Sequence, residues 1–213
     1  MEVVKTVSVE TMRYSDAWTI EHLGISSKEL MLRAGQAIFD AGKWKGQVAI
    51  VCGKGNNGGD GYVVAKLMRE AGIECCIYLL GDSFSEDGRY YYDAALSNGI
   101  RSEQFTEATD LSAYGSILDC ILGTGFKGEV SGITRAAIEA INAAGRSGAY
   151  VVSADINSGL NGNTGTGACY VVSDLTVSIG NFKHGHFCGD ADRAMKEKVN
   201  ADIGIVIQQC PGC

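Results

Sequence analysis

Short apolar runs alternate with amphipathic segments along this chain, and most of the apolar runs stop at a glycine. Runs of about 4–8 residues rich in Val and Ile are typical of strands buried on both faces of a sheet. The runs that fit this description predict strands over residues 48–52, 75–80, 116–122, 150–156, 175–179 and 203–207.

Helices are predicted in the segments between these strands. The first begins at a capping box of Ser26 and Glu29, in which each side chain binds the other residue's backbone N–H. Apolar residues then recur along one face of each segment, and several segments end at glycine or Asn-Gly. The predicted helices cover residues 26–38, 62–70, 83–98 and 134–144.

This alternation predicts an α/β fold with a mostly parallel sheet that helices cover on both faces. Ligands of such sheets bind beyond the carboxyl ends of the strands, so chemistry is expected there. Because no linker, internal repeat or low-complexity stretch interrupts the pattern, residues 1–213 are expected to form a single domain.

Composition and charge narrow the classes of function. Lys and Arg total 18 against 25 Asp and Glu, and the resulting net charge of −7 argues against nucleic acid or an anionic membrane as a partner. The N-terminus lacks the apolar stretch of an export signal, and the longest apolar runs are too short to span a membrane. The eight cysteines do not form a disulfide framework, so a reduced, cytoplasmic protein is expected, with no function for the pair Cys210 and Cys213.

The first predicted strand runs into a glycine-rich segment, residues 53–61. It contains G-x-G-x-x-G, and Asp82 ends the next strand, as in dinucleotide-binding folds. Asp60 argues against that use, because a carboxylate in the first helical turn occupies the positive end that a pyrophosphate would need. A plain glycine turn is the alternative, but Asn56, Asn57 and Asp60 supply more polar groups than a turn requires.

Two further predicted strands carry aspartates at or near their ends. Asp119 interrupts an apolar run, and a buried carboxylate needs a partner or a cation. Asp155 and Ser158 follow the next strand. Together with Asn57 these residues offer hard oxygen ligands, which suit an alkali or alkaline-earth cation and disfavour zinc. A salt bridge or helix cap at Asp119, and a solvated turn at Asp155, stay open as alternatives.

Beyond the strand at 175–179 stand Lys183, His184 and His186. Lys183 is placed to orient a phosphate or another anion, with a solvated loop lysine as the alternative. A zinc site at the two histidines lacks further ligands, so both are expected to be exposed loop residues.

The glycine-rich segment Gly55-Asn56-Asn57-Gly58-Gly59-Asp60-Gly61 resembles the signature of the NAD(P)HX epimerases, which repair hydrated nicotinamide cofactors. Residues 30–35, 119–127, 155–159 and 201–205 resemble that family's N-terminal helix, aspartate-then-glycine strand end, Asp-Ile-Pro-Ser-Gly turn and closing strand. The resemblance covers roughly residues 8–207.

The resemblance implies a three-layer α/β/α sandwich with a Rossmann-like sheet, usually dimeric, that interconverts the R and S forms of NADHX or NADPHX. It implies a potassium ion held by Asn57, Asp119 and Ser158. The expected substrate contacts are those of the matching motifs together with Lys183: Asn56, Asn57, Gly58, Gly59, Asp60, Gly123, Thr124, Gly125, Phe126, Lys127, Gly128, Glu129, Asp155 and Lys183.

Epimerisation of the hydrate requires loss of hydroxide from a ring carbon and its return from the other face. A carboxyl group of suitable pKa can protonate the leaving hydroxyl and deprotonate the incoming water. We assign this role to Asp155. An NAD(P)-dependent oxidoreductase and a non-catalytic nucleotide-binding protein of the same fold are the alternatives.

Leu32, Asn157 and His184 depart from the family pattern, in which Glu, Pro and Pro are usual. The loss of both prolines is expected to loosen turns near the site. In many bacteria this domain is fused to a dehydratase that completes the repair, so the chain is expected to act alone with a dehydratase partner or to be part of a longer protein.

Overall fold

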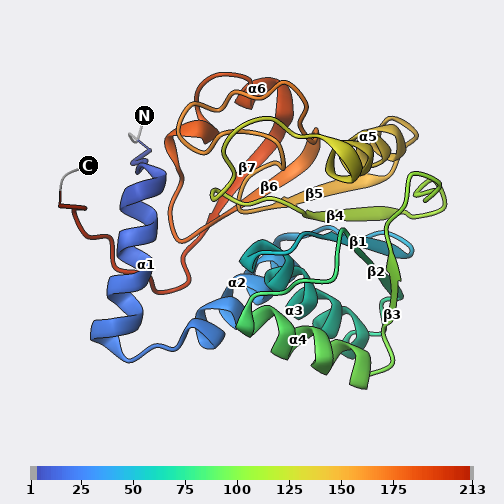
Figure 1. Cartoon of the computed structure of the whole chain (residues 1–213), viewed down its shortest axis with the longest axis horizontal. Helices are drawn as coiled ribbons and strands as arrows, with labels where there is room; N and C mark the ends of the chain where they lie inside the picture. The colour runs from blue at the N-terminus through green and yellow to red at the C-terminus, as the bar shows by residue number, and fades with distance from the viewer. Residues whose placement is uncertain (1–3, 212–213) are drawn as a thin grey trace.

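A sheet of parallel strands forms the centre of the computed structural model, which describes residues 4–211 (Figure 1). It has 7 strands in the order β3-β2-β1-β4-β5-β6-β7. Every neighbouring pair is parallel, which confirms the predicted sheet. The strands are β1 (Val48–Cys52), β2 (Cys75–Leu79), β3 (Arg101–Gln104), β4 (Ser116–Cys120), β5 (Tyr150–Ala154), β6 (Ser173–Ile179) and β7 (Met195–Ala201).

Helices cover both faces of the sheet, as the α/β/α prediction requires. Helices α2 (Ser27–Ala41), α3 (Asn56–Glu70) and α4 (Glu86–Ser97) lie on one face, and α5 (Gly132–Arg146) lies on the other (Figure 1). Two short helices, η1 (His184–His186) and α6 (Ala191–Ala194), precede β7. Helix α1 (Val9–Leu23) stands beside the C-terminal segment, which it binds through Thr19 and Ser15. No helix in the described part of the chain is long and apolar enough to cross a membrane.

The central strands are buried on both sides, which explains their uninterrupted apolar sequences. In β1, Ile50 packs into the core on the side of α2, α3 and α4. Its neighbours Ala49 and Val51 point the other way, into the core under α5. Because both faces are covered, neither set of positions tolerates polar residues.

The edge strands were missed by the sequence pattern. Both β3 and β7 are largely exposed and polar, because each has a neighbouring strand on one side alone. The strand expected at 203–207 is wrong: β7 ends at Ala201, and the segment that follows is irregular. Its apolar residues pack elsewhere, Ile203 against Leu30 and Ala34 of α2.

Two helix boundaries also differ from the prediction. Helix α3 begins at Asn56, so the glycine-rich segment forms its first turns instead of a preceding loop. Helix α4 is capped by Ser85, whose hydroxyl accepts the Gly88 N–H, and not by Ser83. Cys213 lies outside the described residues, so the expectation for the pair Cys210 and Cys213 stays a prediction.

Close contact between α2 and α3 depends on Gly35. A Cβ at this position would lie 2.4 Å from Val63 Cγ1 and 3.1 Å from the Asp60 carbonyl oxygen. Gly35→Ala is therefore expected to lower the free energy of unfolding by about 1–3 kcal/mol, the usual cost of overpacking. This reverses the gain of about 1 kcal/mol that alanine gives over glycine in an exposed helix.

Urea unfolding measures this effect, with Gln36→Ala as the control because Gln36 is exposed on the same helix. The control should change stability by less than about 0.5 kcal/mol. A Gly35→Ala protein as stable as the wild type would contradict the proposed packing.

Candidate functional site

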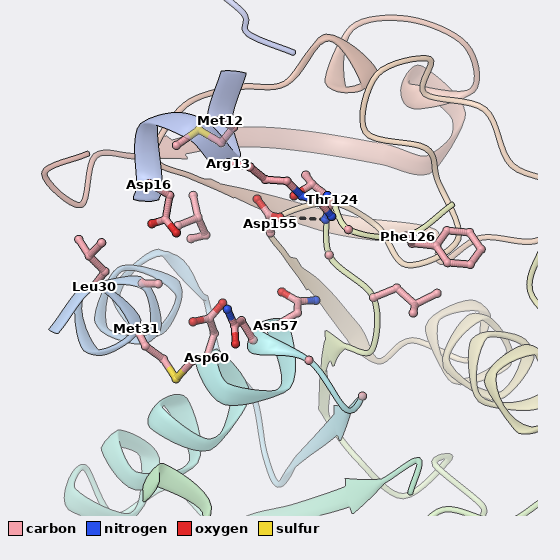
Figure 2. A pocket seen from close by; sticks show the side chains of 18 of the residues that line it. Met12, Arg13, Asp16, Leu30, Met31, Asn57, Asp60, Thr124, Phe126 and Asp155 are labelled. Atoms are coloured by element: carbon pink, nitrogen blue, oxygen red, sulfur yellow. Dashed lines mark hydrogen bonds between the residues drawn. The ribbon is translucent and has the colours of Figure 1, made fainter. Parts of the chain in front are cut away.

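A cavity of about 710 Å³ lies at the carboxyl ends of the central strands, where ligands of parallel sheets bind (Figure 2). The segments that follow β1, β4 and β5 form its floor, and α1 and α2 form the facing wall. Among the residues predicted from sequence, its lining includes Asn56, Asn57, Asp60, Gly123, Thr124, Gly125, Phe126, Asp155 and Lys183.

The other predicted site residues do not line this cavity. Gly58 and Gly59 are buried in the first turn of α3. Lys127, Gly128 and Glu129 are exposed, and the Lys127 ammonium lies 3.9 Å from the Glu10 carboxylate. Asp119 and Ser158 are fully buried behind the lining.

The glycines of the segment after β1 allow backbone to pack against backbone. A Cβ at Gly53 would lie 1.9 Å from the Ile121 carbonyl oxygen, and one at Gly58 would lie 2.2 Å from the Gly53 carbonyl oxygen. Gly55 begins α3 without a side-chain cap. The first N–H groups of α3 therefore remain available to an anionic ligand in the cavity.

Asp155 is held by all of its polar groups at the end of β5. Its backbone N–H donates to the Val177 carbonyl at 2.8 Å, and its own carbonyl lies 2.8 Å from His186 Nε2. Its carboxylate accepts the Thr124 N–H at 3.1 Å (Figure 2) and pairs with the Lys183 ammonium. Among residues 4–211 it is the one non-glycine residue with a positive φ, 63°. Such a conformation persists where the surroundings impose it.

Lys183 is buried at 1% exposure, so the solvated-lysine alternative is wrong. Its ammonium donates to Asp155 and, at 2.8 Å, to the Ile179 carbonyl. Burial by itself raises the pKa of Asp155, but the Lys183 charge and the hydrogen bonds from Lys183 and Thr124 hold that pKa below its usual range. Asp155 is therefore an ionised carboxylate and not a solvated turn residue.

Asp60 is in the opposite electrostatic state. Its carboxyl group is buried and has no hydrogen-bond or ion-pair partner among the described residues. Burial raises the pKa of Asp60 well above its usual value, and the negative charges of Asp155 and Asp16 raise it further against the effect of Lys183. Figure 2 shows Asp16, Asp60 and Asp155 on different elements around the same cavity. Environments that separate two carboxyl pKa values are typical of acid–base sites.

The Asp119 carboxylate accepts four hydrogen bonds from neighbouring backbone and hydroxyl groups. The donors are the Ile121 N–H, the Ser153 hydroxyl and both the N–H and hydroxyl of Ser158. Burial raises the pKa of Asp119 and these hydrogen bonds lower it in part. No lysine, arginine or histidine of the described residues forms an ion pair with it, so the salt-bridge alternative finds no support there.

Asn57 has a buried side-chain amide whose oxygen and nitrogen both lack a partner. A Cβ at Gly123 would lie 3.5 Å from Asn57 Cβ and 3.2 Å from Asp155 Oδ2, so the segment after β4 connects these residues. Ser158 binds the same segment, because its hydroxyl accepts the Leu122 N–H at 2.8 Å. An unpartnered amide oxygen, a serine hydroxyl and one uncompensated carboxylate fit a monovalent cation. No group of three or more His, Cys, Asp or Glu residues within 4–211 is arranged to hold a metal.

The facing wall of the cavity was not predicted from the sequence. It comprises side chains of α1, which is not among the predicted helices, and of α2, which was predicted as a helix but not as part of the site. Because α1 and α2 are far in sequence from the strand ends, the sequence does not indicate that they face those ends across the cavity. The residues concerned are Met12, Arg13, Asp16, Leu30 and Met31.

Two expectations are wrong: that His186 is an exposed loop residue, and that Asn157 loosens its turn. His186 is fully buried, because η1 folds back toward Asp155, whereas His184 is exposed and bonds Thr6. Asn157 does not loosen its turn. Its buried amide nitrogen donates to the Val171 and Ala194 carbonyls at 2.9 Å each, so hydrogen bonds fix the position that proline usually fixes by its ring.

The chain is similar to proteins of known family. The family model described as YjeF-related protein N-terminus matches residues 27–185. The bifunctional NAD(P)H-hydrate repair enzyme Nnr of Methanothermobacter thermautotrophicus is 36% identical over 206 residues, which cover 87% of this chain and 38% of that enzyme. The chain thus spans well under half of that relative's length.

A relative of similar length is the NAD(P)H-hydrate epimerase of Levilactobacillus brevis, which is 32% identical over 209 residues covering 96% of each chain. The crystal structure of yeast ynu0 matches with a TM-score of 0.75 at 18% identity, covering 91% of this chain and 87% of that one. This structural likeness confirms the fold.

Proposed function

The chain belongs to the family of YjeF-related N-terminal proteins, and we propose that it is an NAD(P)H-hydrate epimerase, an isomerase that interconverts the R and S forms of hydrated NADH or NADPH. The observation that carries this proposal is the cavity itself. It combines an uncapped helix N-terminus, a glycine-lined entrance and an ionised carboxylate at its floor. The first two features suit a diphosphate, and the third suits proton transfer.

Substrate binding is assigned to the segments after β1 and β4. Asn56 and Asn57 open α3 and line the cavity, and the first N–H groups of this helix can bind the diphosphate of the nucleotide. Asp60 does not oppose a diphosphate there, because burial raises its pKa and favours the neutral carboxyl group. Gly123, Thr124 and Gly125 present backbone without bulk, so the hydrated ring can approach Asp155.

The sequence assigned both proton transfers to Asp155, but its lowered pKa leaves it without a proton to donate. In this proposal Asp60 therefore donates the proton and Asp155 accepts one. The hydroxyl leaves the ring carbon together with a proton from Asp60, which burial keeps neutral, and an iminium cation remains. Asp155, ionised beside Lys183, faces that cation and takes a proton from the water that adds to the opposite face. Each turnover leaves Asp60 ionised and Asp155 protonated, so the reverse reaction uses the two groups in exchanged roles. A proton passed from Asp155 to Asp60 through solvent restores the starting state.

A potassium ion is assigned to Asn57, Asp119 and Ser158. The support is the unpartnered Asn57 amide and the uncompensated buried charge of Asp119. When bound, the ion supplies a positive charge that balances Asp119 and stiffens residues 121–124, next to the reacting ring. In this proposal the ion takes no part in the proton transfers, which Asp60 and Asp155 carry out.

The wider organisation follows from the resemblance and from the relatives' names. We propose one domain that acts in the cytoplasm as a homodimer. Since the Methanothermobacter relative is called a bifunctional repair enzyme, a dehydratase is the proposed partner, on the same chain or a separate one.

The direct test of the function is isomer exchange. Resolved R-NADHX incubated with the protein and followed by chromatography should reach the R–S equilibrium far faster than by spontaneous drift, with no change in the amount of reduced nicotinamide. An unchanged isomer ratio would favour a binding protein. Net oxidation or reduction would favour an oxidoreductase.

The role of Asp155 is tested by Asp155→Asn, since asparagine keeps the volume and tolerates a positive φ. Turnover at saturating substrate should fall by about 10²–10⁴-fold, because the proton acceptor is lost, while substrate binding changes little. Asp110→Asn, an exposed aspartate outside the cavity, is the control and should behave as wild type. If Asp155→Asn weakened binding and left kcat near normal, Asp155 would orient the substrate and not transfer protons.

The potassium site is tested by thermal unfolding in KCl and in choline chloride at equal ionic strength. Binding to the folded state alone raises its stability with ligand concentration, so KCl should raise Tm above the choline value. Asn57→Ala should abolish the difference without disturbing other contacts, because the Asn57 amide bonds no described residue. Equal Tm values for the wild type in both salts would contradict a potassium site.

A further inference from the structure

His186 connects the segment after β6 to the backbone of Asp155. Its ring is fully buried, and its Nε2 lies 2.8 Å from the Asp155 carbonyl oxygen. Its Nδ1 lies 3.1 Å from the Lys183 backbone nitrogen. One imidazole therefore bridges the two residues of the ion pair through their main chains, while their side chains pair directly.

The hydrogen bonds fix the tautomer of this histidine. The Asp155 carbonyl can only accept, so Nε2 carries the proton of the neutral ring. Nδ1 then accepts the Lys183 N–H, although it also lies 3.2 Å from the Lys183 carbonyl oxygen. Burial and the nearby Lys183 charge lower the pKa of His186 to about 4, so the ring is neutral near pH 7. The bridge is thus a fixed structural element across the physiological pH range.

The turn that carries His186 is itself rigidly supported. Gly185 donates its N–H to the Gly162 carbonyl at 2.8 Å. A Cβ at Gly185 would lie 2.5 Å from the Asn161 carbonyl oxygen, so the turn packs tightly on residues 161–162. The Phe182 and His186 rings pack edge to face, with centroids 5.5 Å apart. His186 therefore has little freedom to follow a movement of Asp155.

Asp155 needs such support because its φ of 63° is unfavourable for a residue with a Cβ. Relaxation to an ordinary β conformation would rotate the Asp155 carbonyl away from His186 and swing the carboxylate out of line with the cavity. We propose that His186 is a positioning residue, which holds the Asp155 backbone in its left-handed conformation and thereby aims the carboxylate at the substrate. This inference rests on the proposed epimerase function and on the role of Asp155 in it.

The test compares His186→Phe, His186→Gln and His184→Phe in the isomer-exchange assay. Phenylalanine keeps the ring but removes both hydrogen bonds, so kcat should fall by about 10–100-fold, the scale expected for a small misplacement of a reacting group, with KM little changed. Glutamine retains an N–H donor for the Asp155 carbonyl and should recover most of the loss. His184 is exposed on the same turn, so His184→Phe should match the wild type.

Circular dichroism and thermal unfolding establish the folded fraction of each variant, and rates are expressed per folded protein. A kcat for His186→Phe equal to that of His184→Phe would overturn the inference. So would equal losses in the Phe and Gln variants, which would indicate a packing role. An inactive wild type would instead refute the proposed function, and a crystal structure of His186→Phe would then still test the inference through the φ of Asp155, which should leave the left-handed region.

Discussion

The buried ion pair between Lys183 and Asp155 is the interaction on which the site depends. A buried lysine without a counter-charge would lose its proton or unfold the region, and removal of one partner from such a pair typically costs about 3–5 kcal/mol. Here the pair joins the end of β5 to the segment after β6, which are far apart in sequence but adjacent in the sheet. The ion pair sets the position of the Asp155 carboxylate. The turn that follows Lys183 also contacts the Asp155 backbone, through His186.

The carboxyl groups around the cavity differ in their electrostatic surroundings, because the buried lysine pairs with Asp155. Lys183 pairs with Asp155 and not with Asp60 or Asp16, so burial and the negative charge of Asp155 raise the pKa of both groups, that of Asp60 most. Asp119 is separated from the cavity by the segment after β4 and is stabilised by hydrogen bonds instead of by an opposite charge. One site therefore presents an ionised and a neutral carboxyl group together, the arrangement that the proposed epimerisation uses.

The sequence predicted those strands that helices cover on both faces of the sheet. Strands β1, β2 and β4 to β6 are covered on both faces, so their apolar runs identified them, whereas β3 and β7 lie at the edges and carry polar residues. Strand-end residues such as Asn57, Asp60 and Asp155 could be found because parallel strands bring their carboxyl ends together. The roles of Asp16 and His186 could not, since tertiary packing alone brings α1 to the cavity and His186 to the backbone of Asp155.

The ionisation state of Asp155 is the central claim, and ¹³C NMR of the labelled carboxyl groups measures it directly. The Asp155 resonance, assigned by its absence in Asp155→Asn, should titrate below the ordinary aspartate pKa of 3.8. In Lys183→Met the same resonance should titrate well above that value, because burial then acts without the opposing charge. An Asp155 pKa at or above 3.8 in the wild type, or one unchanged by Lys183→Met, would contradict the account.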